Sequence, residues 1–149
     1  MVQLKALNTR EKKEIFQMLE EQFGITEHLD YIFFENNKDK IFIISPAFAQ
    51  LNQAQVRINN IGMYFATMEK DGLRLSIEGA QLVNAKKNSL ELTKEQAHQW
   101  MKGEDIPFEG NLGYVIVRYK KDKFGCGSLK NNILRNMVPK ERRLHSITE

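Results

Sequence analysis

The fold of this chain is decided by residues 125–144, which read GCGSLKNNILRNMVPKERRL. The polar pair Asn131-Asn132 separates two β-rich runs, 124–129 and 133–138, and this pattern predicts a β-hairpin. Pro139 has no backbone N–H to donate to a strand ladder, so we expect the second strand to end before it. Basic residues follow that proline. The stretch therefore predicts a hairpin that leads directly into a cationic segment.

The rest of the chain alternates short β-rich runs with a few helical segments. Helices are expected after Asn8, Ser76 and Thr93, because each can accept hydrogen bonds from the free N–H groups of a first helical turn. Strands are expected at 31–34, 41–44, 61–68, 73–75, 90–92 and 113–119. The pattern predicts an α+β fold, in which a helix and a β-hairpin precede a small mixed or closed sheet with two short helices.

We expect a domain boundary at residues 52–55, which divides the chain into an N-terminal α+β module, 1–55, and a C-terminal unit, 56–149. In the second unit, residues 113–119 alternate in character. Side chains of a strand point to opposite faces in turn, so Val115 and Val117 should lie on the face opposite to Tyr114 and Ile116.

Charge is distributed unevenly along the chain. The formal net charge is +3, but residues 111–149 contain nine basic and three acidic residues, whereas residues 1–110 contain 13 basic and 16 acidic ones. A cationic segment of this kind indicates a polyanionic partner. A basic surface that only keeps the protein in solution explains the same charges equally well.

Composition argues against a membrane protein or an exported one. Hydrophobic residues make up 42% of the 149 residues, and no apolar run reaches the roughly 18 residues of a membrane span. The N-terminus shows no apolar signal segment, and the single cysteine, Cys126, excludes an intramolecular disulfide. We therefore expect a cytoplasmic protein with no membrane partner.

No cluster of residues indicates a catalytic or metal centre. His28, His98 and His145 have no second ligand at helical spacing, so surface histidines are the simpler interpretation. Cys126 could act as a nucleophile beside a base, but a small buried residue at a bend in a sheet explains it better. We expect no enzymatic activity, no metal and no cofactor.

Several features fit nucleic-acid binding instead. Glycines in turns let backbone amides approach phosphate oxygens, and such glycines occur at Gly62, shortly before Arg74 and on both sides of Cys126. Tyr64 or Phe65 could stack on bases, although one of the two must face the core. Each glycine alone is better explained by a structural turn. Their coincidence with the basic segment favours binding.

Three blocks of sequence, in the right order, resemble the motifs of PUA domains. The first is GMYFA at 62–66 followed by LSIEGA at 75–80, the second consists of Ala97, Trp100 and Gly103-Glu104, and the third is the stretch 125–144. The resemblance is greatest to the PUA domains of Nop/Sun-type RNA cytosine methyltransferases and of small archaeal pre-PUA/PUA proteins. Residues 1–55 are similar, in architecture more than in motif, to the helix-plus-hairpin module that precedes such domains.

The resemblance implies a mixed β pseudo-barrel with two short helices that binds structured RNA. Two positions depart from the pattern: Ala66 stands where the family often has glycine, and Ser128 where it often has lysine. Both departures would weaken contact with RNA. The resemblance implies the RNA-facing residues Gly62, Tyr64, Ala66, Ser76, Arg135, Lys140, Arg142 and Arg143, and charge and turn position add Arg74 and Lys130.

We therefore expect a non-catalytic protein that binds tRNA or rRNA and serves in RNA modification or ribosome assembly, beside a modifying enzyme or an assembly factor. The alternative is a protein-interaction module of a ribosome-assembly or translation complex, suggested by the acidic residues 1–110 and the aromatic run Tyr31–Phe34. A third hypothesis is an RNA-modifying enzyme, which would need a pocket with a histidine around Cys126. The first hypothesis requires that the basic residues share one face.

Overall fold

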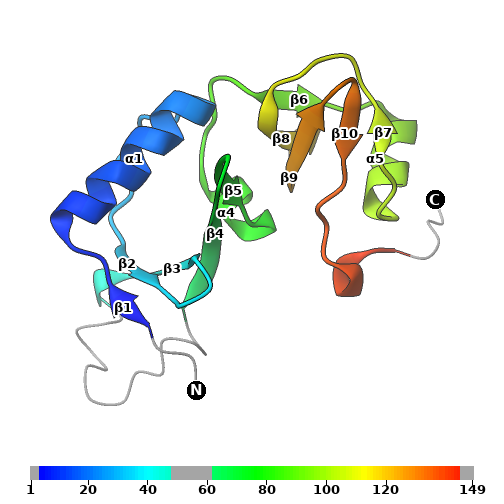
Figure 1. Cartoon of the computed structure of the whole chain (residues 1–149). Coiled ribbons are helices and arrows are strands. Elements are labelled where there is room, and N and C mark those ends of the chain that lie inside the picture. The colour runs from blue at the N-terminus through cyan, green and yellow to red at the C-terminus, as the bar shows by residue number, and fades with distance from the viewer. Residues whose placement is uncertain (1–3, 48–61, 145–149) are drawn as a thin grey trace.

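The computed structural model describes residues 4–47 and 62–144, which form two five-stranded sheets and several short helices (Figure 1). This architecture confirms the expected α+β fold, with a helix and a hairpin before a curled mixed sheet. The elements in chain order are β1 (Lys5–Ala6), α1 (Thr9–Phe23), β2 (Ile32–Glu35), β3 (Lys40–Ile44), β4 (Met63–Glu69), β5 (Gly72–Leu75), α4 (Ile77–Leu82), β6 (Ser89–Glu91), α5 (Lys94–Met101), β7 (Ile106–Pro107), β8 (Gly113–Tyr119), β9 (Asp122–Lys130), β10 (Ile133–Arg135) and the 3₁₀ turn η1 (Lys140–Arg142).

The first sheet is antiparallel throughout and has the strand order β1-β2-β3-β4-β5. The predicted hairpins β2–β3 and β4–β5 are both present, and Gly72 supplies the positive φ of 141° in the second turn. Because β3 pairs with β4, strands from both sides of the expected domain boundary share one sheet. The boundary residues themselves, 52–55, lie outside the described residues.

Helix α1 covers one face of this sheet (Figure 1). Asn8 accepts a hydrogen bond from the backbone N–H of Glu11, whose carboxylate accepts one from the backbone N–H of Asn8, so the predicted capping box is confirmed. The apolar stripe of α1 is buried, and Phe33 of β2 makes edge-to-face contacts with Phe16 of α1 and Phe65 of β4, at ring-centroid distances of 5.5 and 5.9 Å.

The second sheet has the order β6-β8-β9-β10-β7, with β6 parallel to β8 and the other pairs antiparallel. The predicted hairpin β9–β10 turns at Asn131 and Asn132, which have positive φ angles of 54° and 63°. Strand β10 is shorter than predicted. The Asn136 side chain donates to the carbonyl of Trp100, and its backbone N–H donates to Asp105, so the chain leaves the ladder after Arg135.

Strand β8 contributes to two hydrophobic cores. Tyr114 and Ile116 belong to the core formed with α1, the first sheet and α4, whereas Val115 and Val117 belong to the core under α5. The predicted alternation is therefore confirmed, and all four residues are buried. The second core is closed by α5, whose Trp100 is fully buried. Within the described ranges, no helix is long and apolar enough to cross a bilayer.

Candidate functional site

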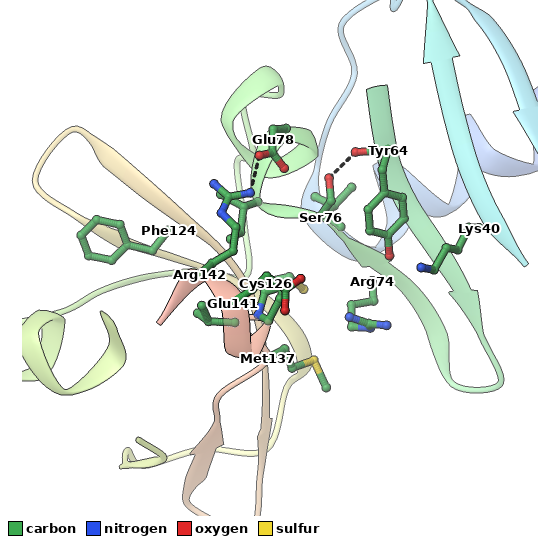
Figure 2. A pocket seen from close by; sticks show the side chains of 14 residues that line it. Lys40, Tyr64, Arg74, Ser76, Glu78, Phe124, Cys126, Met137, Glu141 and Arg142 are labelled. Carbon is green, nitrogen blue, oxygen red and sulfur yellow. Dashed lines mark hydrogen bonds and ion pairs between the residues drawn. The ribbon is translucent and has the colours of Figure 1, made fainter. Parts of the chain in front are cut away.

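A cleft of about 370 Å³ lies between the outer face of β3–β5 and the segment after β10. One wall carries Lys40, Tyr64 and Arg74, which point to the same side of their strands in Figure 2, and the start of α4 adds Ser76 and Glu78. The other wall is formed by Phe124 and Cys126 of β9 and by residues 137–139, 141 and 142. Three segments distant in sequence therefore meet at this cleft.

The cationic wall is built by cross-strand pairing. Thr67 of β4 lies opposite Lys40 of β3 on one side and opposite Arg74 of β5 on the other, which places the three side chains in one row. The Lys40 ammonium lies 5.2 Å from the ring centroid of Tyr64, and the Tyr64 hydroxyl bonds to Thr67. The guanidinium of Arg74 pairs with Glu69 at 3.1 Å. The row and the adjoining Tyr64 therefore present two cations, Lys40 and Arg74, and one aromatic ring to the cleft.

The start of α4 is held by Ser76. Its hydroxyl accepts a hydrogen bond from the N–H of Gly79 and donates one of 2.6 Å to the carbonyl of Tyr64, so Ser76 both caps the helix and ties it to β4. Gly79 lies against that strand, since a Cβ on Gly79 would come within 2.1 Å of the Phe65 carbonyl oxygen. Ser76 therefore acts on the cleft through the position it gives to α4.

Arg142 of η1 lies on the opposite wall and pairs with Glu78, with 2.5 Å between Nη1 and Oε1. Burial raises the pKa of Glu78, but hydrogen bonds from Arg142 and from its own backbone lower it by more, so its carboxylate is favoured over its acid form. Glu141 also lines the cleft. The cleft thus contains three cations, Lys40, Arg74 and Arg142, and two carboxylates.

Lys130 and Tyr114 meet at the turn of β4–β5. Asp71 accepts hydrogen bonds of 2.7 Å from both the Tyr114 hydroxyl and the Lys130 ammonium. The bond from Lys130, and to a lesser degree that from Tyr114, holds the pKa of Asp71 below its usual value. Burial and the hydrogen bond to Asp71 raise the pKa of Tyr114. The contact joins the two sheets beside Arg74.

Arg135 is the last residue of β10, in the second sheet. The register places Arg135 opposite Ser128, and Ser128 opposite Tyr114, so these side chains share a face of the second sheet. Lys140 is exposed in η1. Of the predicted set, Tyr64, Arg74, Ser76 and Arg142 line the cleft. Lys130 pairs with Asp71 instead, and Arg135 and Lys140 are exposed and do not line the cleft.

Three predicted residues are placed otherwise. Ala66 is completely buried in the core, so its side chain contacts β3, β5 and the helices and offers no surface to a partner. The Arg143 guanidinium donates to the carbonyl of Val138, and its side chain lies against Gly103, beyond the cleft walls. Gly62 immediately precedes β4 and is half-buried.

The two glycines around Cys126 serve packing. A Cβ on Gly127 would come within 2.6 Å of the Trp100 ring, and a Cβ on Gly125 would come within 3.0 Å of Ile77. Gly125 therefore lets β9 approach α4, and Gly127 makes room for the indole of α5. We expected these glycines to admit backbone amides to phosphate, and this expectation has to be corrected.

Cys126 is buried, and burial raises the pKa of its thiol to about 12. A thiol of this kind is a poor nucleophile, because the thiolate is the reactive form. The cleft beside it is lined by no histidine among the described residues. The aromatic run 31–34 is likewise used internally in part, since Phe33 is buried.

Sequence reasoning missed three residues of the cleft: Lys40, Glu78 and Phe124. Lys40 follows a polar turn in the N-terminal hairpin, and only the pairing of β3 with β4 brings it to Tyr64. Glu78 was visible only as an acidic residue in a short helix. Phe124 was visible only as the first residue of a β-rich run. The run alone does not say whether its side chain faces the core or the surface.

Residues 87–144 match the family model described as the PUA domain of the RsmF methyltransferases. The chain is also 29% identical over 136 residues to the ribosomal RNA small subunit methyltransferase F of Vibrio cholerae, a match that covers 89% of this chain and 28% of the relative. The same-named protein of Shewanella woodyi is 27% identical over 91% of this chain and 29% of its own length.

The chain thus spans a little over a quarter of the length of the curated relatives that it matches. The matched segment runs from just before β6 to the residues after η1, and so includes the second sheet, α5 and one wall of the cleft. The α+β architecture agrees with the PUA motifs of the sequence. The matched segment of this chain is therefore similar to the PUA domain of the RsmF-type methyltransferases.

Proposed function

We propose that this chain binds structured RNA without catalysing a reaction on it, and that the cleft between β3–β5 and η1 is the binding surface. The single observation that carries the proposal is the convergence of Lys40, Arg74 and Arg142 on one cleft, next to the Tyr64 ring. Cations neutralise phosphates, and helical RNA is recognised mainly by its shape and its backbone.

We propose ribosomal RNA as the target in preference to tRNA, because the relatives are named as methyltransferases of small-subunit ribosomal RNA. The chain would then act in RNA modification, beside a catalytic domain or a modifying enzyme. The raised pKa of Cys126 and its burial support the non-catalytic part of the proposal.

The proposed division of the chain at residue 55 gives each part a role. Residues 56–149 supply Arg74, Arg142 and the matched PUA segment, whereas residues 1–55 supply Lys40. The N-terminal module would therefore complete the cationic wall.

The test is RNA binding by the whole chain as a function of salt concentration. We expect the affinity for ribosomal RNA fragments to fall steeply as salt rises, because each phosphate contact releases counterions. A double variant, Lys140→Ala with Arg142→Ala, should weaken binding to all RNAs similarly, since contacts to phosphate carry no sequence information. Lys12→Ala with Lys13→Ala, on α1, is the matched control for the loss of two positive charges. Unchanged affinity in the double variant, or no binding at low salt, would contradict the proposal.

A further inference from the structure

The loop between α1 and β2 borders two cavities that the proposed function does not use. The first, of about 370 Å³, is lined by helix residues that include Phe16 and Glu20 and by residues 25–28 of the loop. The second, of about 580 Å³, follows the loop to the residues after β3 and shares Glu27 and His28 with the first. Because the two cavities share residues, they form one groove, which we call the α1 groove.

The α1 groove is separate from the cleft. Within the described ranges, no residue that lines the groove also lines the cleft. Leu73 of β5 is fully buried in the core that includes α1, whereas the next residue, Arg74, lines the cleft. Successive side chains of a strand point to opposite faces, so α1 and the cleft lie on opposite faces of the first sheet.

The floor of the α1 groove is apolar and preformed. Leu19, Ile25 and Leu29 line it and are buried, and they anchor the loop to the core. Phe16 and Tyr31 also line the groove and are only half-buried, so part of each ring is open to a partner. A site that is already ordered costs less conformational entropy when a partner binds.

The rim of the groove is acidic. Glu20, Glu27 and Asp30 are exposed, and no lysine or arginine among the described residues lines either cavity. One cation reaches the edge, where the Lys86 ammonium donates to the Thr26 hydroxyl. No ion pair within the described part of the chain includes any of the three carboxylates. The rim therefore has an excess of negative charge.

Two of these carboxylates lie where an external cation would be favoured. Glu20 belongs to the last turn of α1, which has no basic residue, and the backbone carbonyls give that end of a helix a negative partial charge. Glu27 accepts hydrogen bonds of 2.7 and 3.0 Å from the backbone N–H and the side-chain amide of Asn84. These neutral donors fix the carboxylate without compensating its charge, and they leave some of its lone pairs open.

The arrangement of charge selects the occupant. Among the described residues, no three acidic or histidine side chains come close enough to hold one metal ion. An RNA phosphate would be repelled by the rim, because its charge has the same sign. The groove instead suits separate cations that are joined by an apolar part, as in a peptide that combines arginine or lysine with leucine. Arginine suits it best, since a guanidinium can pair with both oxygens of a carboxylate.

We propose that the α1 groove binds a basic peptide segment of a partner protein, with cations at Glu20 and Asp30 and an apolar side chain between Phe16 and Tyr31. This inference goes beyond the proposed function and does not depend on it. The chain would bind RNA at one face of the first sheet and a protein at the other, and so connect the two.

The experiment measures fluorescence anisotropy with three short labelled peptides. In the first peptide arginine alternates with leucine, in the second arginine alternates with glycine, and in the third glutamate alternates with leucine. We expect the whole chain to bind the first peptide, to bind the second more weakly because the apolar contact is lost, and not to bind the third. Equal binding of the two arginine peptides would overturn the inference, since the apolar floor would then take no part.

The double variant Glu20→Gln with Asp30→Asn should weaken binding of the first peptide about tenfold, because two exposed ion pairs are lost. It should not weaken RNA binding. The matched control is Glu95→Gln with Glu109→Gln, which removes two exposed carboxylates that do not line the groove. The control should bind the first peptide as the native chain does. An equal loss in both double variants would overturn the inference, since the peptide would then respond only to net charge.

Hydrogen exchange locates the peptide on the native chain. We expect slower exchange in residues 25–31 when the first peptide is added, and protection confined to the cleft would overturn the inference. Urea denaturation of the double variant should show a folded protein, because both replaced side chains are exposed. RNA binding is measured separately, so failure of the peptide experiments would leave the proposed function intact.

Discussion

The guanidinium of Arg142 lies 2.5 Å from the carboxylate of Glu78, and this ion pair bridges the two walls of the cleft. Glu78 belongs to the first turn of α4 and Arg142 to the 3₁₀ turn after Pro139. Both side chains are close to half-exposed, at 41% and 46%, so the pair adds little to stability. Its larger effect is that Glu78 occupies the Arg142 guanidinium, which an RNA phosphate could otherwise bind.

Glu78→Gln should therefore increase the affinity for RNA. We expect an increase of about two- to fivefold, because the contribution of a half-exposed ion pair, up to about 1 kcal/mol, no longer competes with phosphate. Glu95→Gln is the matched control, since Glu95 is the acidic residue in the first turn of α5 and does not line the cleft. Fluorescence anisotropy with labelled RNA would measure both variants. A weaker affinity of Glu78→Gln would show that the pair organises the site instead of competing with RNA.

Tyr114→Phe should destabilise the protein, because it removes the hydrogen bond to Asp71 that joins the sheets. We expect a loss of about 1 kcal/mol in urea denaturation at neutral pH. The pKa of Asp71 is lower in the folded state than usual, so the stabilisation is complete above the ordinary pKa and is lost as the pH falls through the folded value. The difference between the native protein and Tyr114→Phe should therefore shrink below about pH 4.

Tyr119→Phe, which removes a hydroxyl from the other tyrosine of β8, a partly exposed one, is the control for this experiment. It should change the free energy of unfolding by less than about 0.5 kcal/mol. A Tyr114→Phe effect that persisted at low pH would mean that the hydroxyl acts through something other than the Asp71 carboxylate.

Gln22→Leu should also destabilise the fold. The Gln22 side-chain amide donates to the Leu73 carbonyl and accepts from the Leu73 N–H, so it takes the place of a neighbouring strand at the edge of β5. Removal of these bonds leaves two backbone groups without a partner, which costs about 1–3 kcal/mol. Gln17→Leu, on the exposed face of the same helix, should cost less than about 0.5 kcal/mol. Equal effects of the two substitutions in urea denaturation would refute this role.

Cys126 should resist alkylation by iodoacetamide at pH 8 as long as the protein is folded. Burial excludes the reagent and raises the pKa of the thiol to about 12, so almost no thiolate is present. The thiol should react readily in urea, where both effects are absent, and mass spectrometry would detect the added group. Rapid alkylation of the folded protein would indicate that the cleft opens around β9.

Local signals in the sequence predicted local structure well. The capping boxes at Asn8 and Thr93 fix the starts of α1 and α5 because the interacting groups are only three residues apart. The hairpin at Asn131-Asn132 followed from residues that tolerate positive φ. The two-residue strands β1 and β7 were missed, since a run of two residues has no periodicity to detect.

The site was predictable only where it is local. The charge of the C-terminal segment pointed to Arg142, but the partner of that arginine, Glu78, is 64 residues away in sequence. Lys40 reaches the cleft through a strand pairing that no short motif encodes. Ala66 was misplaced for the opposite reason: its position in a motif is clear, but only the structure shows that its side chain faces the core.

Strand β8 packs into both hydrophobic cores, and this affects how the protein unfolds. Its odd-numbered valines and its even-numbered Tyr114 and Ile116 pack on opposite sides, so neither core can loosen without releasing a strand from the other. The two cores should therefore melt as a single cooperative unit, and the cleft should keep its shape for as long as the molecule is folded.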